Sequence, residues 1–235
     1  MFDKGLFILG TDTHVGKTTV ALNLLSFLKN NGYSTIGLKP VSSGAQLTKD
    51  GLRNPDALAL QKEASIYLPY KQVNSFCFSL ATAPHIAAAQ QASQLSVAKI
   101  IKSFQSLLKV EVDYCIIEGL GGAAVPLNKT ETMLDLLQVL NLPVILVVGL
   151  RLGCLNHALL TYEILRKRNI LIAACVANQI DPDMRFYEEN GLYLKESLDV
   201  PFFTLLRYQE KKALACDICI DWSNLINTEN VSAFV

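Results

Sequence analysis

The segment Gly10-Thr-Asp-Thr-His-Val-Gly-Lys-Thr-Thr19 constrains the fold of this chain more than any other. It follows the apolar run Leu6–Leu9, which is typical of a buried strand, and it precedes a stretch in which apolar residues recur at helical spacing as far as Gly32. A strand, a glycine-bearing loop and a helix that opens on Gly-Lys-Thr together predict a phosphate-binding loop. Main-chain N–H groups at a helix N-terminus can face an anion, and the helix dipole favours negative charge there.

The loop also indicates which side chains meet the phosphates. We expect Lys17 to reach the terminal phosphates of a nucleoside triphosphate and the Thr18 hydroxyl to bind Mg²⁺. Gly10 and Gly16 enclose five residues, 11–15, whereas the usual pattern has four, so the loop is a variant of the common motif. A glycine-rich turn that binds no ligand remains the alternative interpretation of these residues alone.

Composition narrows the class of protein. Among 235 residues, 21 are Lys or Arg and 21 are Asp or Glu, and this neutral balance is not typical of a nucleic-acid-binding protein. The basic cluster Arg166–Arg168 fits the last turn of a helix, where it complements the dipole. The longest apolar run, Pro143–Val148, has the length of a strand and not of a membrane span. The N-terminal residues lack signal-peptide character, so we expect a cytoplasmic protein without a membrane or nucleic-acid partner.

The six cysteines lie mostly in apolar surroundings, as expected of buried, reduced thiols. Cys216 and Cys219 form one C-x-x-C pair, but the histidines at 14, 85 and 157 do not supply a second pair of ligands at zinc-binding spacing. We therefore expect structural or incidental cysteines.

The order of elements predicts an α/β fold. Predicted strands are 6–9, 35–38, 114–117, 144–148, 172–177 and 202–205, and several are continuous apolar runs, which indicates strands covered on both faces. Predicted helices between them include 96–109, with Ser96 as N-cap and an apolar stripe of Val97, Ile100, Ile101, Phe104 and Leu108, and 156–168. The alternation predicts a doubly wound, mainly parallel sheet flanked by helices, with residues 1–235 forming a single domain of the P-loop NTPase type.

Ligands of such sheets bind outside the carboxyl ends of the strands. Lys17 follows the first strand, Lys39 the second and Glu118 the third, and the segment 149–153 follows the fourth. We expect all four to meet at one edge of the sheet.

Three of these segments carry groups suited to phosphate chemistry. Glu118, followed by the glycine-rich run 119–122, suggests a second Mg²⁺ contact, and the alternative is a solvated strand end. Lys39, followed by Ser42, Ser43 and Gly44, offers a second cation for a transferred phosphoryl group, and the alternative is a surface lysine. Asn54-Pro55-Asp56 reads as a helix start in which Asp56 complements the dipole.

Taken together, these segments resemble the dethiobiotin synthetases, the ATP-dependent carboxylases of biotin synthesis. The resemblance runs in the same order along residues 5–180. The matching segments are 10–18, 39–44, 51–60, 83–85, 118–122, 142–149, 152–161 and 176–178.

The resemblance implies a reaction and a set of roles. It implies that 7,8-diaminononanoate, CO₂ and ATP, with Mg²⁺, become dethiobiotin, ADP and phosphate through a carbamate and its mixed anhydride with phosphate. It also implies a homodimer with the substrate site at its interface. The implied catalytic residues are Lys17 and Lys39, and the implied metal ligands are Thr18, Asp56 and Glu118. The implied nucleotide-binding residues are His14, Val15, Gly16, Lys17, Thr18, Thr19, Asp56, Glu118, Gly119, Leu120, Gly121 and Asn178. The implied substrate-binding residues are Thr13, Ser43, Gly121, Gly153 and Asn156, the last two reaching the neighbouring subunit's substrate.

The chain departs from this family around the nucleotide base. Gln179 stands where the family commonly has aspartate, and residues 203–208 replace a segment that carries purine contacts, so base selectivity is not defined by the resemblance.

Two alternative functions remain for this chain. A cobyrinate-type amidating synthetase typically carries a further glutaminase domain, for which 235 residues leave no room. A partition- or septum-positioning ATPase normally carries a lysine near the first glycine of the loop, where this chain has Thr11, Asp12 and Thr13.

Overall fold

The computed structural model describes residues 4–205 and 220–226. Its centre is a sheet of six strands in the order β10-β9-β8-β1-β7-β2, in which every neighbouring pair is parallel. The strands are β1 (Gly5–Gly10), β2 (Thr35–Leu38), β7 (Tyr114–Glu118), β8 (Val144–Leu150), β9 (Ile172–Gln179) and β10 (Phe202–Leu205). The predicted fold class and all six predicted strands are confirmed.

Helices and short strand pairs connect these strands. The helices are α1 (Lys17–Asn30), α2 (Pro55–Glu63), α3 (Tyr70–Val73), α4 (Pro84–Gln90), α5 (Val97–Ser103), the 3₁₀ helix η1 (Gln105–Lys109), α6 (Met133–Leu140), α7 (Cys154–Lys167), α8 (Tyr187–Ser197) and α9 (Ser223–Ile226). Strand β3 (Val41–Ser42) pairs with β6 (Phe76–Cys77), and β4 (Gln46–Thr48) forms a hairpin with β5 (Gly51–Arg53).

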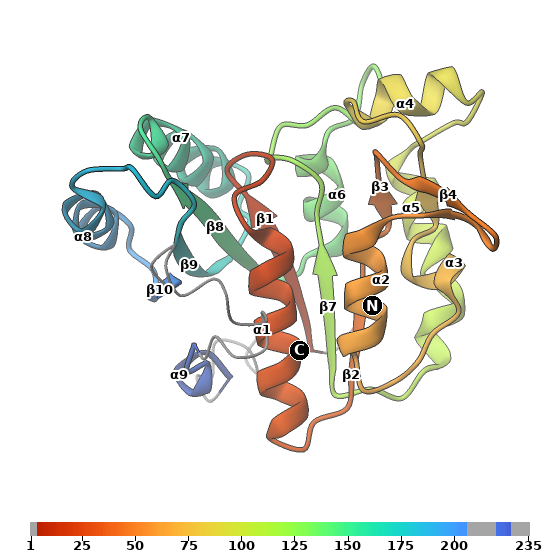
Figure 1. Cartoon of the computed structure of the whole chain (residues 1–235), viewed down its shortest axis with the longest axis horizontal. Coiled ribbons are helices and arrows are strands. Elements are labelled where there is room, and N and C mark those ends of the chain that lie inside the picture. The colour runs from red at the N-terminus through yellow and green to blue at the C-terminus, as the bar shows by residue number, and fades with distance from the viewer. Residues whose placement is uncertain (1–3, 206–219, 227–235) are drawn as a thin grey trace.

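The sheet is covered on both faces. Leu6 and Ile8 of β1 pack in one core together with α1, and Phe7 and Leu9 pack in the other with α6 and α7. Successive side chains of a strand point to opposite faces, so a strand covered on both sides is apolar throughout. In Figure 1, α1 lies in front of the strands and α6 behind them.

One predicted helix differs in its second half. Ser96 caps α5 as expected, because its hydroxyl accepts the N–H of Lys99. The helix ends at Ser103, however, and continues as η1 from Gln105. A 3₁₀ helix has 3.0 residues per turn in place of 3.6, and here Leu107 is 1 % exposed whereas Leu108 is 52 % exposed. The prediction that Leu108 completes the apolar stripe was therefore wrong.

The C-terminal part of the described chain packs on α1. Trp222 is fully buried, and its indole N–H donates to Oδ1 of Asn23 at 2.8 Å. Asn23 is itself a buried polar residue in the middle of α1. This contact fixes the described segment 220–226 against the helix that carries the phosphate loop.

The thiols of the described cysteines are free, and three of the four are buried. Burial raises the pKa of Cys175 to about 12 and that of Cys115 well above its ordinary value, as expected of structural thiols. Cys216 and Cys219 lie outside the described residues. Within residues 4–205 and 220–226, no helix combines the length and apolar character that crossing a membrane requires.

Candidate active site

The phosphate loop lies at the point where the strand order of the sheet reverses. From β1 the chain moves to β2 and β7 on one side and then to β8, β9 and β10 on the other. The loop 11–16 leaves the carboxyl end of β1 between β7 and β8, which is where doubly wound sheets bind ligands. Lys17, Lys39 and Glu118 meet at one edge as expected, because all three line the same cavity. The fourth segment, 149–153, reaches the phosphate loop through an ion pair between Arg151 and Asp12, but it does not line this cavity.

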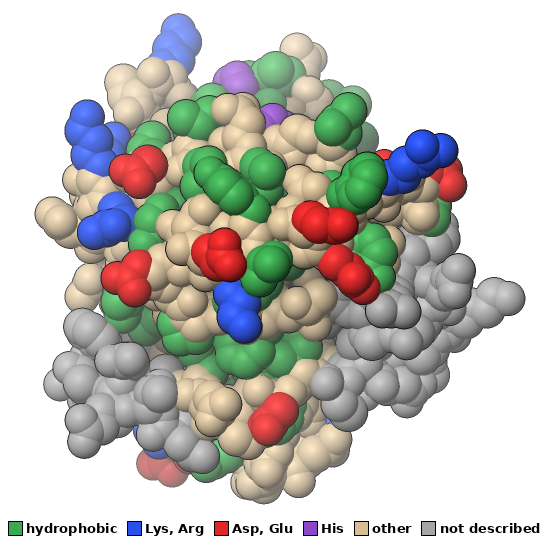
Figure 2. Space-filling model, turned by 90° about the vertical axis from the view of Figure 1, so that its left-hand side faces the viewer, with side chains coloured by type: hydrophobic (Ala, Val, Ile, Leu, Met, Phe, Trp, Pro, Cys, Tyr) green, Lys and Arg blue, Asp and Glu red, His purple; other side chains and the backbone are tan. Residues whose placement is uncertain are grey.

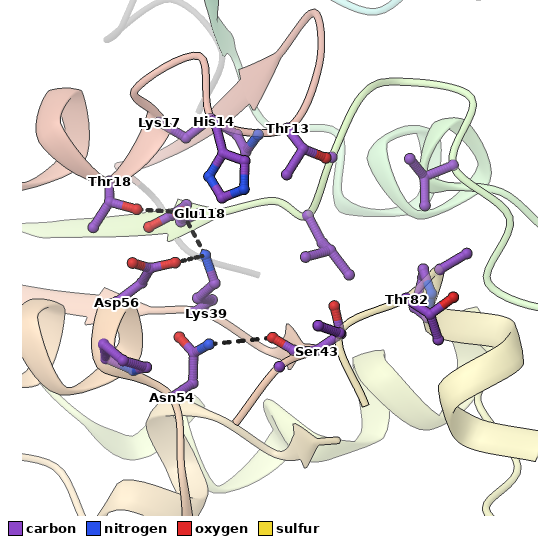
Figure 3. Close-up of a pocket in the computed structure, with 18 of the residues that line it drawn as sticks. Thr13, His14, Lys17, Thr18, Lys39, Ser43, Asn54, Asp56, Thr82 and Glu118 are labelled. Atoms are coloured by element: carbon purple, nitrogen blue, oxygen red, sulfur yellow. Dashed lines mark hydrogen bonds and ion pairs between the residues drawn. The ribbon is translucent and has the colours of Figure 1, made fainter. Parts of the chain in front are cut away.

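This cavity has a volume of about 890 Å³ and opens at the carboxyl edge of the sheet (Figure 3). That volume lies in the range of small-molecule sites. It is lined by residues of the phosphate loop, of the segment after β2, of the start of α2 and of the loop after β7. The predicted site residues that line it are Thr13, His14, Gly16, Lys17, Thr18, Thr19, Lys39, Ser43, Asp56, Glu118, Leu120 and Gly121.

The phosphate loop needs glycine at position 16. Gly16 has a φ of 99°, a left-handed conformation that other residues rarely adopt, and it forms the N-cap of α1. A Cβ atom at this position would lie 2.0 Å from Nδ2 of Asn178. Asn178, at the end of β9, donates from that nitrogen to the carbonyl of Val15 at 2.8 Å. The side chain of Asn178 therefore packs against Gly16 and stabilises the loop through its hydrogen bond to Val15.

Lys17 begins α1 and is almost fully buried. Its ammonium group donates to the main-chain oxygen of Asp12 at 2.7 Å. Burial lowers the pKa of Lys17 from 10.5 to about 8, and the attraction of Glu118 offsets only part of this effect. An anionic phosphate beside Lys17 would favour the charged form and raise the pKa again.

Lys39 lies at the end of β2 and forms two ion pairs. Its ammonium group is 2.9 Å from Oδ2 of Asp56 and 2.5 Å from Oε1 of Glu118. The Thr18 hydroxyl donates to the same Oε1 at 2.9 Å. Figure 3 shows the four side chains converging from the start of α1, the residue after β2, the start of α2 and the end of β7.

Local sequence explains how α2 presents Asp56. Asn54 is the N-cap and accepts the N–H of Ala57 at 3.2 Å, and Pro55 occupies the first helical position. This is the helix start predicted from these residues. Asp56 therefore lies in the first turn, where it complements the dipole, and it also reaches Lys39, so the two interpretations of Asp56 are compatible.

The residues at this point fit a hard cation such as Mg²⁺. Thr18, Asp56 and Glu118 offer a hydroxyl and two carboxylates, the oxygen ligands that Mg²⁺ prefers. Oε2 of Glu118 is buried and has no hydrogen-bond partner, so one carboxylate oxygen is available. In the part of the chain that the structure describes, no three His, Cys, Asp or Glu side chains gather as a self-sufficient metal centre. A cation here would therefore complete its shell with phosphate and water.

Five predicted residues do not line the cavity. The side chain of Val15, within the phosphate loop, is buried in the core, and Gly119 packs against the ring of Phe7. Asn178 lies behind Gly16, and its Oδ1 atom is buried without a partner. Gly153 and Asn156 are exposed at the N-terminus of α7 and are absent from the cavity lining of the single chain.

Sequence reasoning missed one wall of the cavity. Ala81, Thr82, Ala83 and Pro84, which lead into α4, line the cavity, and so does Val125 of the loop after β7. Residues 83–85 belong to the segments that carry the family resemblance, and Pro84 marks the first position of a helix, but neither signal assigned these residues to the site. The wall is mostly apolar and suits an aliphatic ligand.

A parallel sheet with a phosphate loop at its switch point, beside a strand-end carboxylate and a threonine hydroxyl, defines the class of P-loop nucleotide-binding proteins. A family model described as an AAA domain matches residues 4–215. The ATP-dependent dethiobiotin synthetase BioD of Cellvibrio japonicus is 47% identical over 201 residues, which are 86% of this chain and 88% of that protein. The chain therefore belongs to the ATP-dependent dethiobiotin synthetase family.

Other relatives agree with this assignment. The proteins of the same name from Pseudomonas paraeruginosa and Yersinia pestis are 46% and 42% identical, over 83% and 87% of this chain and 86% and 85% of theirs. Among solved structures, the septum site-determining protein MinD from Pyrococcus horikoshii superposes with a TM-score of 0.54 at 18% identity, over 98% of this chain and 92% of that one. A putative plasmid partition protein from Borrelia burgdorferi has a TM-score of 0.53 at 13% identity, over 100% and 98% of the two chains. At such low identity these two structures show the fold alone, and the sequence relatives do not favour the partition-type alternative.

Proposed function

We propose that this chain is an ATP-dependent dethiobiotin synthetase that closes a cyclic urea from 7,8-diaminononanoate and CO₂, with ATP and Mg²⁺. The observation that carries this proposal is the convergence of Lys17, Lys39, Asp56 and Glu118 on a cavity that continues along an apolar wall. The charged end suits a triphosphate, and the apolar wall suits the aliphatic chain of the diamine.

The first two steps create a leaving group. An amine nitrogen of the substrate attacks CO₂, forms an N–C bond and loses a proton, which gives a carbamate. A carbamate oxygen then attacks the γ-phosphorus of ATP, the bond to the β-phosphate oxygen breaks, and ADP leaves. Lys17 and Lys39 balance the negative charge of the phosphates and the carbamate in this transfer.

The last step closes the ring. The second amine attacks the carbonyl carbon of the mixed anhydride, phosphate leaves, and the nitrogen loses a proton. A site that holds this amine against the carbonyl supplies proximity, for which effective molarities reach about 10⁵–10⁸ M in favourable cases. We assign Thr13, Ser43 and Gly121 to the carbamate and diamine, because they line the same cavity as Lys39.

The nucleotide and the metal occupy the other end of the site. We assign the main-chain amides of residues 14–19 to the phosphates, residues 119–121 to the nucleotide and Asn178 to the purine. Thr18, Asp56 and Glu118 are the proposed Mg²⁺ ligands, and the bound ion would supply positive charge on the β- and γ-phosphates. Oδ1 of Asn178, buried and unpartnered, is an acceptor suited to an exocyclic amino group of a base.

We further propose a homodimer of single-domain chains in which Gly153 and Asn156 reach the neighbouring subunit's substrate. Both are exposed at the N-terminus of α7, next to Leu152, which is 96 % exposed. Figure 2, which faces the side of α7 and α8, shows apolar side chains distributed over this surface between charged ones. Exposed apolar residues here include Leu160, Phe186 and Leu192. We place the reaction in the cytoplasm.

Turnover tests the proposal directly. We expect phosphate release from MgATP only when the diamine and bicarbonate are both present, together with formation of the cyclic urea. Lys17→Gln and Lys39→Gln should each lower kcat by about 100-fold or more, since each removes a positive charge beside the transferred group, and this loss should exceed what their effect on folding explains. Robust hydrolysis without the diamine, stimulated by DNA or lipid, would favour a partition-type ATPase instead.

A further inference from the structure

Lys39 occupies the position that the proposed metal ligands surround. Its ammonium nitrogen lies 2.5 Å from Oε1 of Glu118 and 2.9 Å from Oδ2 of Asp56. Thr18, the third proposed ligand, donates its hydroxyl to the same Oε1 atom. Every one of the proposed ligands is thus engaged with Lys39 directly or with the carboxylate oxygen that Lys39 holds (Figure 3).

This arrangement is buried and charged. The side chain of Lys39 is 4% exposed and that of Glu118 is 1% exposed. Burial lowers the pKa of Lys39, but the attraction of Glu118 and Asp56 outweighs it, and the pKa lies above its ordinary value. Lys39 is therefore an ammonium ion at neutral pH, and it supplies the positive charge that the buried carboxylate requires.

A divalent cation and this ammonium group compete for the same two carboxylates, Asp56 and Glu118. Mg²⁺ binds its oxygen ligands at about 2.0–2.1 Å, closer than an ammonium donor approaches. If both cations shared Glu118, they would be separated by a few ångströms in a poorly solvated site and would repel each other strongly. Oε2 of Glu118 has no partner, but a divalent cation bound there would lie close to the ammonium group on Oε1, and this repulsion would drive Lys39 away from Glu118.

The triphosphate changes this balance. Phosphate oxygens add negative charge at the phosphate loop and supply further ligands for the metal. They also give the displaced ammonium group a new anionic partner, on the side of the cavity where the phosphoryl group is transferred. In such a complex Lys39 would move from the metal ligands to the reacting groups as the metal site fills.

On the basis of the proposed function, we propose that Lys39 is the resident cation of the Thr18–Asp56–Glu118 site and keeps divalent metal out until nucleotide binds. Metal and nucleotide consequently bind with strong positive coupling, and this coupling is reciprocal. Lys39 is thereby a positioning residue for the metal in addition to its role in charge balance during phosphoryl transfer.

Binding of Mn²⁺ to the full-length, nucleotide-free protein tests this role without turnover. Free Mn²⁺ is followed by electron paramagnetic resonance for the wild type, Lys39→Met and Lys17→Met. Lys17 is the matched control, because it is a buried lysine of the same cavity whose ammonium group donates to the main-chain oxygen of Asp12 and to neither carboxylate. We expect Lys39→Met to bind Mn²⁺ at least about ten-fold more tightly than the wild type and Lys17→Met to gain less than about three-fold.

Two further variants locate the effect. Lys39→Met/Glu118→Gln should lose the added affinity, which would place the Mn²⁺ at Glu118. Lys39→Gln, which keeps a polar group of similar length, should reproduce the gain if Lys39→Met does not fold. In the presence of ADP, Mn²⁺ affinity should rise more for the wild type than for Lys39→Met.

Two results would overturn the proposal: unchanged or weaker Mn²⁺ binding in both Lys39 variants, or equal gains in the Lys39 and Lys17 variants, which would reflect net charge alone. Neither result depends on the substrate of the enzyme. A protein that fails to make dethiobiotin but shows the ten-fold gain would contradict the proposed function and support this role of Lys39.

Discussion

The side-chain amide of Asn74 donates a hydrogen bond of 2.5 Å to the main-chain oxygen of Lys39. Asn74 is 2 % exposed, and its own oxygen accepts the hydroxyls of Ser42 at 2.8 Å and Tyr70 at 3.0 Å. The Tyr70 oxygen in turn accepts the N–H of Asn54, the N-cap of α2. One buried amide thus connects the segment that carries Lys39 with the helix that carries Asp56.

We therefore expect Asn74→Leu to lower both stability and turnover. The substitution leaves buried polar partners unpaired, which should lower the free energy of unfolding by about 2–4 kcal/mol, measured by urea denaturation. Because Lys39 and α2 lose their common support, kcat should fall more than ten-fold at a temperature where the variant is folded.

Asn128→Leu is the control for Asn74→Leu. The Asn128 side chain also holds a loop, since it donates to the carbonyl of Leu95 and accepts the N–H of Glu131, but it does not line the cavity. We expect a comparable loss of stability with kcat within about two-fold of the wild type. If both variants lost kcat equally, Asn74 would have only a structural role.

Gly16→Ala should abolish nucleotide binding. The new Cβ atom would meet the Asn178 side chain at 2.0 Å, and the residue would keep a φ of 99°. Gly32 is a matched control, because its φ is 83° but nothing lies within 4 Å of a Cβ built there. Both variants carry the backbone strain of about 1–2 kcal/mol, and only Gly16→Ala distorts the phosphate loop. Titration with ADP by calorimetry should show wild-type affinity for Gly32→Ala; loss of binding in both would trace the effect to strain alone.

Binding of MgADP should take up protons near pH 8. Burial lowers the pKa of free Lys17 to about 8, so at pH 8 about half of the molecules carry the neutral amine. Phosphate beside Lys17 raises the pKa, and the bound form is therefore fully protonated. Affinity should then fall as pH rises through 8, because the free form holds fewer protons than the bound form.

Calorimetry in two buffers of different ionisation enthalpy measures this uptake, which should be about half a proton per site at pH 8. Lys17→Arg keeps the charge at all accessible pH values and should take up none. An uptake that persists unchanged in Lys17→Arg would assign the proton to another group.

Trp222→Phe should loosen the C-terminal segment from α1. The ring is fully buried and its N–H is the hydrogen-bond donor nearest to Oδ1 of Asn23, at 2.8 Å. Loss of that donor in a buried site should lower the free energy of unfolding by about 1–3 kcal/mol in urea denaturation. The exposed Asn224→Ala should change it by less than about 0.5 kcal/mol. A Trp222→Phe variant as stable as the wild type would show that the hydrogen bond contributes little.

Much of the fold could be predicted because each element carries its own signal. Continuous apolar runs such as that of β8 mark strands covered on both faces, and Asn54-Pro55 marks the start of α2. The rule that parallel strands present ligands at their carboxyl ends then predicted that Lys17, Lys39 and Glu118 would meet. The family resemblance added Asp56 to the predicted metal ligands, whereas the local sequence indicated only that Asp56 lies at a helix start.

The three-dimensional structure alone decided the relations between distant side chains. The parallel-strand rule brought Lys39 and Glu118 to one edge but did not predict their direct ion pair. No sequence pattern indicated the contacts of Asn178 with the Val15 carbonyl or of Trp222 with Asn23, which join segments far apart in the chain. The change from α5 to η1, which buries Leu107 in place of Leu108, was likewise set by packing. The sequence specifies the local conformation and the buried face of each element. Which buried charges pair depends on the tertiary structure, because packing decides which charged side chains are removed from water at the same place.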